Sequence, residues 1–82
     1  MSDATADCRA ALEAADAGRW EQAHGLVQAH EGHALADWIH AVVHKVEGDL
    51  GNSRYWYRRA GRLAHVDDEP TAELEAIRAE LV

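Results

Sequence analysis

The chain is poor in the residues that cross-link or interrupt small folds. Its 82 residues include one cysteine, one proline, one methionine and no phenylalanine. The lone Cys8 excludes an intramolecular disulfide framework and a cysteine-based zinc site, which fits a reducing cytosol. No uncharged apolar run approaches the roughly 18 residues of a membrane span. Residues 1–7 also lack the basic start and apolar block of a secretory signal. We therefore expect a cytoplasmic protein with no membrane segment.

Basic residues are also scarce. Eight Lys and Arg stand against 15 Asp and Glu, which gives a formal net charge of -7. This balance argues against general binding of nucleic acid or anionic lipid, because both need a positive surface. Most of the basic residues lie close together, at Lys45, Arg54, Arg58, Arg59 and Arg62. The C-terminal region is acidic, with Asp67, Asp68, Glu69, Glu73, Glu75 and Glu80. We expect these carboxylates to pair with the arginines.

No β-pattern competes with a helical interpretation of the chain. Helix propensity and glycine stops predict five helices in a single domain, residues 1–82. The first four are expected near residues 4–17, 20–30, 33–47 and 53–61, the fourth capped by Asn52 or Ser53. The fifth is expected to begin with Asp67 or Asp68 near its cap and Pro70 in its first turn. The predicted class is all-α.

An internal repeat relates the two inner turns. Residues 18–23 align with residues 48–53 at an offset of 30, which suggests stacked helix pairs. The second copy resembles tetratricopeptide and Sel1-like repeats at Gly48, Leu50, Ser53, Tyr57 and Ala60. The first copy matches at Gly18, Trp20, Ala23 and Val27, and departs at His30. Residues 36–40 and 55–61 also resemble segments of small bacterial helical proteins. The resemblance implies a five-helix bundle of two tetratricopeptide-like hairpins plus a C-terminal helix, and partner binding rather than catalysis.

A polar stripe marks the third predicted helix. Its members are spaced 4, 3, 4 and 3 residues apart and fall on one face, at His33, Asp37, His40, His44 and Glu47. Three interpretations stand side by side. The stripe can be covered by the fourth helix, with neutral imidazoles bonded to Tyr55, Tyr57 or backbone carbonyls. It can be a solvated face. It can also bind metal, with His40 and His44 as an i, i+4 pair and Glu47 or Asp37 as an oxygen ligand.

The fourth predicted helix carries a candidate partner surface. Arg54, Arg58 and Arg62 follow i, i+4, i+8 spacing, with Tyr55 beside them, whereas Trp56 is expected in the core. Trp20 and Trp38 are expected core anchors as well. No phosphate-binding loop or nucleophile motif is present, so neither catalysis nor a cofactor is expected. The sequence predicts a protein-interaction module that binds an acidic protein or peptide, with a homodimer as one form. Metal binding by the stripe is the alternative function.

Overall fold

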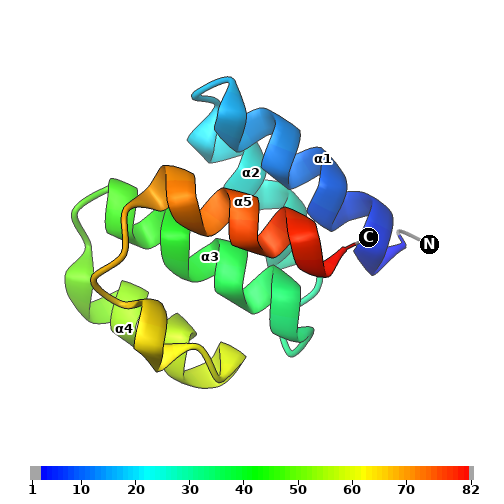
Figure 1. The fold of residues 1–82 in the computed structure, drawn as a ribbon. Helices are drawn as coiled ribbons and strands as arrows, with labels where there is room; N and C mark the ends of the chain where they lie inside the picture. Colours follow the sequence, from blue (N-terminus) through cyan, green and yellow to red (C-terminus); the bar gives the residue numbers. More distant parts are fainter. Residues whose placement is uncertain (1–2, 82) are drawn as a thin grey trace.

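Five α-helices make up the computed structural model, which describes residues 3–81 (Figure 1). In chain order they are α1 (Ala4–Asp16), α2 (Trp20–Gln28), α3 (Ala34–Val46), α4 (Leu50–Ala60) and α5 (Pro70–Glu80). A short 3-10 helix, η1 (Leu63–His65), lies between α4 and α5. The described residues contain no strand. The predicted all-α class with five helices is confirmed.

The turns that close the two hairpins share one geometry. Gly18 and Gly48 have φ of 79° and 83°, in the left-handed region that glycine enters at little cost. The N–H of Arg19 bonds to the carbonyl five residues earlier at 2.8 Å, and that of Asp49 does the same at 2.9 Å. This is the Schellman arrangement, which satisfies the last carbonyls of a helix and stops it. Equivalent bonds therefore reverse the chain twice, 30 residues apart.

The structure corrects the predicted start of α4. Asp49, rather than Asn52 or Ser53, caps α4, and its carboxylate accepts the N–H of Asn52 at 3.4 Å. The turn at Gly48 is so tight that the next helix begins at once. The N-cap position of α5 is Glu69, which makes no side-chain cap hydrogen bond, and Asp68 lies directly before it. Pro70 occupies the first turn of α5 as expected, since its missing N–H needs no partner there.

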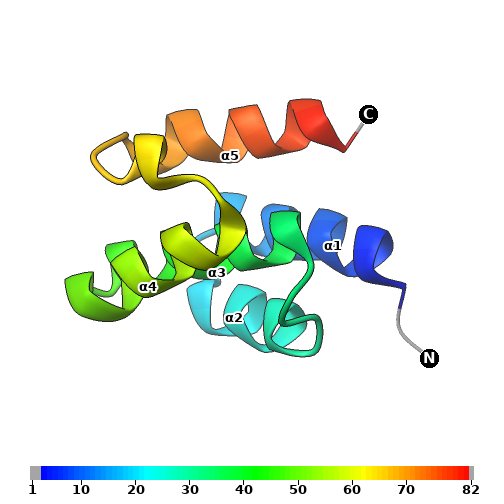
Figure 2. The same ribbon diagram turned by 90° about the horizontal axis from the view of Figure 1, so that it is seen from below.

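The helices lie in three layers (Figure 2). α1 and α3 lie in the middle layer, α2 lies on one side of it and α5 on the other, and α4 packs alongside α3. α3 contacts each of the other four helices. Every residue from 36 to 43 is consequently buried, polar ones included, so α3 has no solvated face along this stretch.

Small and aliphatic side chains fill most of the core. The largest fully buried side chains of the core are Trp38 (1% exposed), Tyr57 (0%), Leu12 (2%) and Ile39 (0%). Trp56 is buried at 8%, which confirms its predicted core position, whereas Trp20 is only partly buried and packs against the core. Among the described residues, no helix has the length and apolar character needed to cross a membrane.

Candidate functional site

Three histidines meet between α2 and α3. His24 comes from α2, and His40 and His44 lie one turn apart on α3. The ring centroids are 4.7 Å apart for His24 and His40, 5.1 Å for His24 and His44, and 5.0 Å for His40 and His44. One nitrogen from each ring can be chosen so that all three lie within 4.8 Å of one another. We call these three residues the histidine cluster.

His40 is the buried member of the cluster. Its side chain is 2% exposed, and its ring stacks on Trp56 of α4 with centroids 3.9 Å apart. Burial, followed by the nearby His24 and His44 and then Arg59, lowers the pKa of His40 to about 4. The ring is therefore neutral at neutral pH, so one of its nitrogens carries a proton and the other has a free lone pair.

A hydrogen bond joins the rings of His24 and His40. Nε2 of His24 lies 3.0 Å from Nε2 of His40, so one ring donates an N–H to the other. Nδ1 of His40 is buried and has no hydrogen-bond partner among the described residues. A buried N–H without an acceptor costs more than an unused lone pair. The proton of His40 is thus placed best on Nε2, where it is donated to His24.

Carboxylates lie at the outer side of the cluster. Nδ1 of half-buried His44 is 3.8 Å from Oδ2 of Asp49 and 3.9 Å from Oε1 of Glu47. Hydrogen bonds from Asn52 lower the pKa of Asp49, which keeps it ionised. Negative charge therefore adjoins the histidines on the side that faces solvent.

The predicted metal set does not assemble as proposed from the sequence. His40 and His44 come together, but Asp37 turns away from them. Both oxygens of Asp37 accept the N–H of Gly32 at 3.2 Å, so this carboxylate holds the α2–α3 turn. Burial raises the pKa of Asp37, an effect that the Gly32 bond opposes. Glu47 is at the C-cap of α3, half exposed, and reaches only His44.

The environment of the stripe varies along α3. Asp37 and His40 are buried at 1% and 2%, whereas Glu47 is exposed. His40 does face α4, through Trp56. The predicted tyrosine partners are engaged elsewhere, because Tyr57 donates to Glu73 and the Tyr55 hydroxyl accepts from Arg59 at 3.2 Å. A solvated stripe is therefore excluded for its central members.

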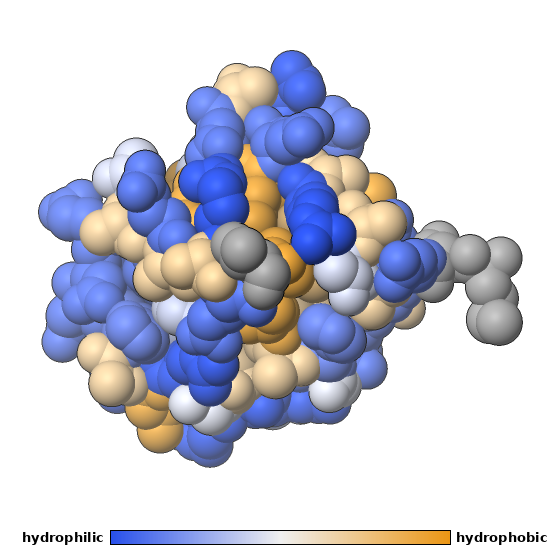
Figure 3. All heavy atoms as spheres, turned by 45° about the vertical axis from the view of Figure 1, so that its right-hand side comes forward, coloured by the Kyte–Doolittle hydropathy of each residue, from blue (hydrophilic) through white to orange (hydrophobic). Residues whose placement is uncertain are grey.

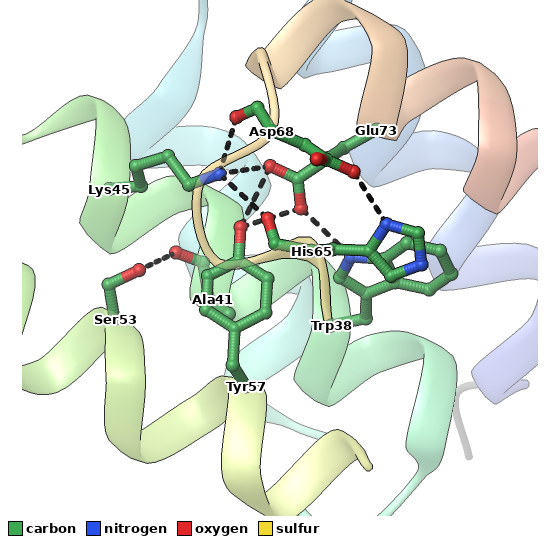
Figure 4. Close-up of polar contacts among 8 residues, drawn as sticks. All are labelled: Trp38, Ala41, Lys45, Ser53, Tyr57, His65, Asp68 and Glu73. Atoms are coloured by element: carbon green, nitrogen blue, oxygen red, sulfur yellow. Dashed lines mark hydrogen bonds and ion pairs between the residues drawn. The ribbon is translucent and has the colours of Figure 1, made fainter. Parts of the chain in front are cut away.

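A second polar cluster surrounds the buried carboxylate of Glu73 on α5 (Figure 4). Tyr57 donates its hydroxyl to this carboxylate, at 2.6 Å from Oε2 and 2.8 Å from Oε1. Trp38 donates its indole N–H to Oε2 at 3.0 Å, and Lys45 forms an ion pair with Oε1. Burial, and next the bond to Glu73, raises the pKa of Tyr57, so its hydroxyl stays protonated. We call these residues the Glu73 network.

Lys45 extends this network to the connection before α5. Its ammonium also donates to the backbone carbonyls of Asp68, at 2.7 Å, and His65, at 3.3 Å. Three donors thus meet three acceptors, which is the condition for burying an ion pair without an unpaired charge. Every polar atom of the network is occupied, and its bonds join η1 and α5 to α3 and α4.

The arginine ridge predicted on α4 is interrupted. The helix ends at Ala60, so Arg62 lies beyond it, donates to Glu80 of α5 at 2.8 Å and covers the ring of Trp38. Arg54 and Arg58 are exposed and make no side-chain hydrogen bond or ion pair within residues 3–81. Arg59 lies over Trp56 at 5.1 Å. The predicted pairing of the acidic tail with this ridge is thus limited to Arg62.

An apolar groove opens between α1 and α5. Arg9, Leu12, Glu13, Arg78 and Leu81 line about 380 Å³ of space. Figure 3 shows hydrophobic surface between strongly hydrophilic side chains on this face of the molecule. Arg9 donates to the carbonyl of Leu81 at 2.7 Å, which ties the end of α5 to α1.

Sequence reasoning missed two residues of these clusters. His24 lies four residues after Trp20 and three before Val27, so it shares the apolar face predicted for α2, and that position was an available signal. Glu73 offered no such signal, because acidic residues in the first turn of a helix are ordinary features of exposed helices.

Comparisons with protein-family models, curated proteins and solved structures give no match. No family is assigned on that ground, and the resemblance to tetratricopeptide repeats stays an expectation.

Proposed function

We propose that this protein is a small helical interaction module that binds an acidic segment of another protein along the exposed face of α4. The proposal depends on one observation. α4 contains three arginines and no acidic residue, in a chain whose net charge is -7.

The exposed face of α4 combines charge with apolar surface. Arg54 and Arg58 are one turn apart and lack partners within the described residues. Leu50 is 67% exposed and Tyr55 is 43% exposed, both on the same helix. Two arginines spaced by four residues match carboxylates one turn apart on a partner helix, and guanidinium groups bind carboxylates in bidentate fashion. An acidic, amphipathic segment satisfies both features.

The rest of the fold holds this face rigid. Trp56, Tyr57, Ser53 and Ala60 anchor the opposite side of α4 in the core, and Ser53 donates to the carbonyl of Ala41 at 2.8 Å. The matching Schellman turns at Gly18 and Gly48 support the proposed arrangement of two repeated hairpins. A protein partner is favoured over nucleic acid because the remaining surface is acidic and repels long polyanions.

The test uses a short fluorescein-labelled helical peptide whose glutamates are spaced four residues apart, followed by fluorescence anisotropy. The wild-type chain is expected to bind it, with affinity that falls as salt is raised. Arg58→Glu is expected to weaken binding about fivefold to tenfold, the effect of roughly one favourable ion pair made repulsive.

Two controls make this result specific. Arg19→Glu makes the same charge change at the start of α2 and should leave the affinity within about twofold, because Arg19 does not belong to α4. A peptide with glutamine in place of glutamate should not bind. Equal loss in Arg19→Glu and Arg58→Glu would refute a site on α4, as would preferential binding of a single-stranded oligonucleotide.

A further inference from the structure

We propose that His24, His40 and His44 bind one divalent transition-metal ion, with Zn²⁺ as the tetrahedral case. The site is independent of the proposed partner surface, because none of its ligands belongs to α4. It also differs from the set expected from the sequence, in which carboxylates completed the pair on α3.

The spacing of the nitrogens is close to that of a metal site. Zinc–nitrogen bonds of roughly 2.0–2.1 Å in a tetrahedron place ligand nitrogens about 3.3 Å apart. The nitrogens of His24 and His40 are already 3.0 Å apart, and the three chosen nitrogens lie within 4.8 Å of one another. The remaining adjustment is about 1.5 Å at most. Rotation of the half-buried rings of His24 and His44 can supply it, because only His40 is fully enclosed.

The chemistry of the donors selects the ion. Three imidazoles without a thiolate or a directly placed carboxylate suit Zn²⁺, Ni²⁺ and Cu²⁺ rather than Mg²⁺ or Ca²⁺. The partial exposure of His24 and His44 leaves room for water as a fourth ligand. Asp49 and Glu47, within 3.9 Å of the His44 ring, offset the positive charge of the ion.

The buried side of His40 limits the affinity. When Nε2 of His40 binds the ion, the ring proton moves to Nδ1, and no net proton is released. Nδ1 has no acceptor among the described residues. Metal-bound histidines normally donate this N–H to a second group, and loss of that group weakens binding about 10–100-fold. We therefore expect affinity weaker than that of fully supported three-histidine sites by this factor.

The experiment titrates the untagged, metal-free chain with Co²⁺ and Zn²⁺. Saturation at one Co²⁺ per chain, with the visible absorption of tetrahedral Co²⁺ and competition by Zn²⁺, is expected. Calorimetry measures the affinity, and light scattering gives the number of chains per particle with and without metal. The variants are His24→Gln and His44→Gln; His40 is left intact because its ring stacks on Trp56 in the core.

Each variant is expected to weaken binding more than about tenfold, since loss of even an outer-shell partner costs that much. The matched control is His65→Gln, which removes a histidine from η1, outside the cluster. It should bind as the wild type does. Melting curves in chelator verify that all variants are folded. Absence of saturable binding, or unchanged binding in folded His24→Gln, would overturn the proposal. A metal-dependent dimer with half an ion per chain would also overturn it.

Discussion

Replacement of Glu73 by glutamine tests whether the buried ion pair holds α5 in place. The amide has nearly the same shape as the carboxylate but no charge. Lys45, with a side chain only 13% exposed, then keeps its two backbone carbonyls and loses its counter-ion. In addition, Tyr57 and Trp38 both donate to this carboxylate, and the amide replaces one acceptor oxygen with a donor.

The expected loss is large for a chain of this size. Removal of one partner from a buried pair costs about 3–5 kcal/mol, because the other charge stays buried and unpaired. An 82-residue domain has a free energy of unfolding of about 4–12 kcal/mol in total. Glu73→Gln should therefore remove a large fraction of the stability and lower the melting temperature by more than about 10 °C.

Urea denaturation followed by tryptophan fluorescence measures the change, because Trp38 belongs to the network. The matched control is Glu80→Gln, which breaks the exposed pair with Arg62 and should cost less than about 1 kcal/mol. A double-mutant cycle with Lys45→Met isolates the coupling between the two charges. If Glu73→Gln and Glu80→Gln cost the same, or if the cycle shows no coupling, the assigned role of the network is wrong.

Two further outcomes follow from pKa shifts. Burial raises the pKa of Cys8 to about 11, and its side chain is 0% exposed. A thiol reagent should therefore label Cys8 only at the rate at which the chain unfolds. Labelling of the native chain at the rate of a free thiol would contradict this. Burial lowers the pKa of His40 in the native chain to about 4. Between about pH 6.5 and pH 4, His40 is therefore protonated in the unfolded chain and neutral in the native chain. The free energy of unfolding consequently decreases as the pH is lowered through this range. In chelator, His40→Gln should show a shallower loss of urea midpoint between these pH values than the wild type; equal slopes would refute the assignment.

Much of the helical framework is readable from local sequence. Glycines at 18 and 48 end α1 and α3 because they supply a left-handed backbone conformation, and Pro70 begins α5 because it lacks the N–H that a first turn leaves unpaired. The i, i+4 spacing of His40 and His44 likewise places them on one face in any helix. These are short-range effects, and the structure agrees with each of them.

The partners of polar side chains depend instead on how distant helices meet. Helical spacing groups Asp37 with the histidines of α3, yet its carboxylate accepts the N–H of Gly32. His24, 16 residues before His40, completes the cluster instead. Arg62 continues the i, i+4 spacing of the arginines in the sequence. In the structure, α4 ends before Gly61, and the Arg62 side chain bonds to Glu80 instead.

Burial separates what periodicity can predict from what it cannot. Periodicity predicts which residues share a face, and it does not say how many neighbours cover that face. α3 contacts four other helices, so the central members of the polar stripe, Asp37 and His40, lie in the interior although the sequence of α3 is amphipathic. In the sequence, Glu73 is an ordinary acidic residue in the first turn of a helix. In the structure, Trp38, Lys45 and Tyr57 from α3 and α4 all bond to its carboxylate. Local propensity thus sets the helices and their ends, whereas the packing of helices far apart in the chain sets which charges and imidazoles are buried together.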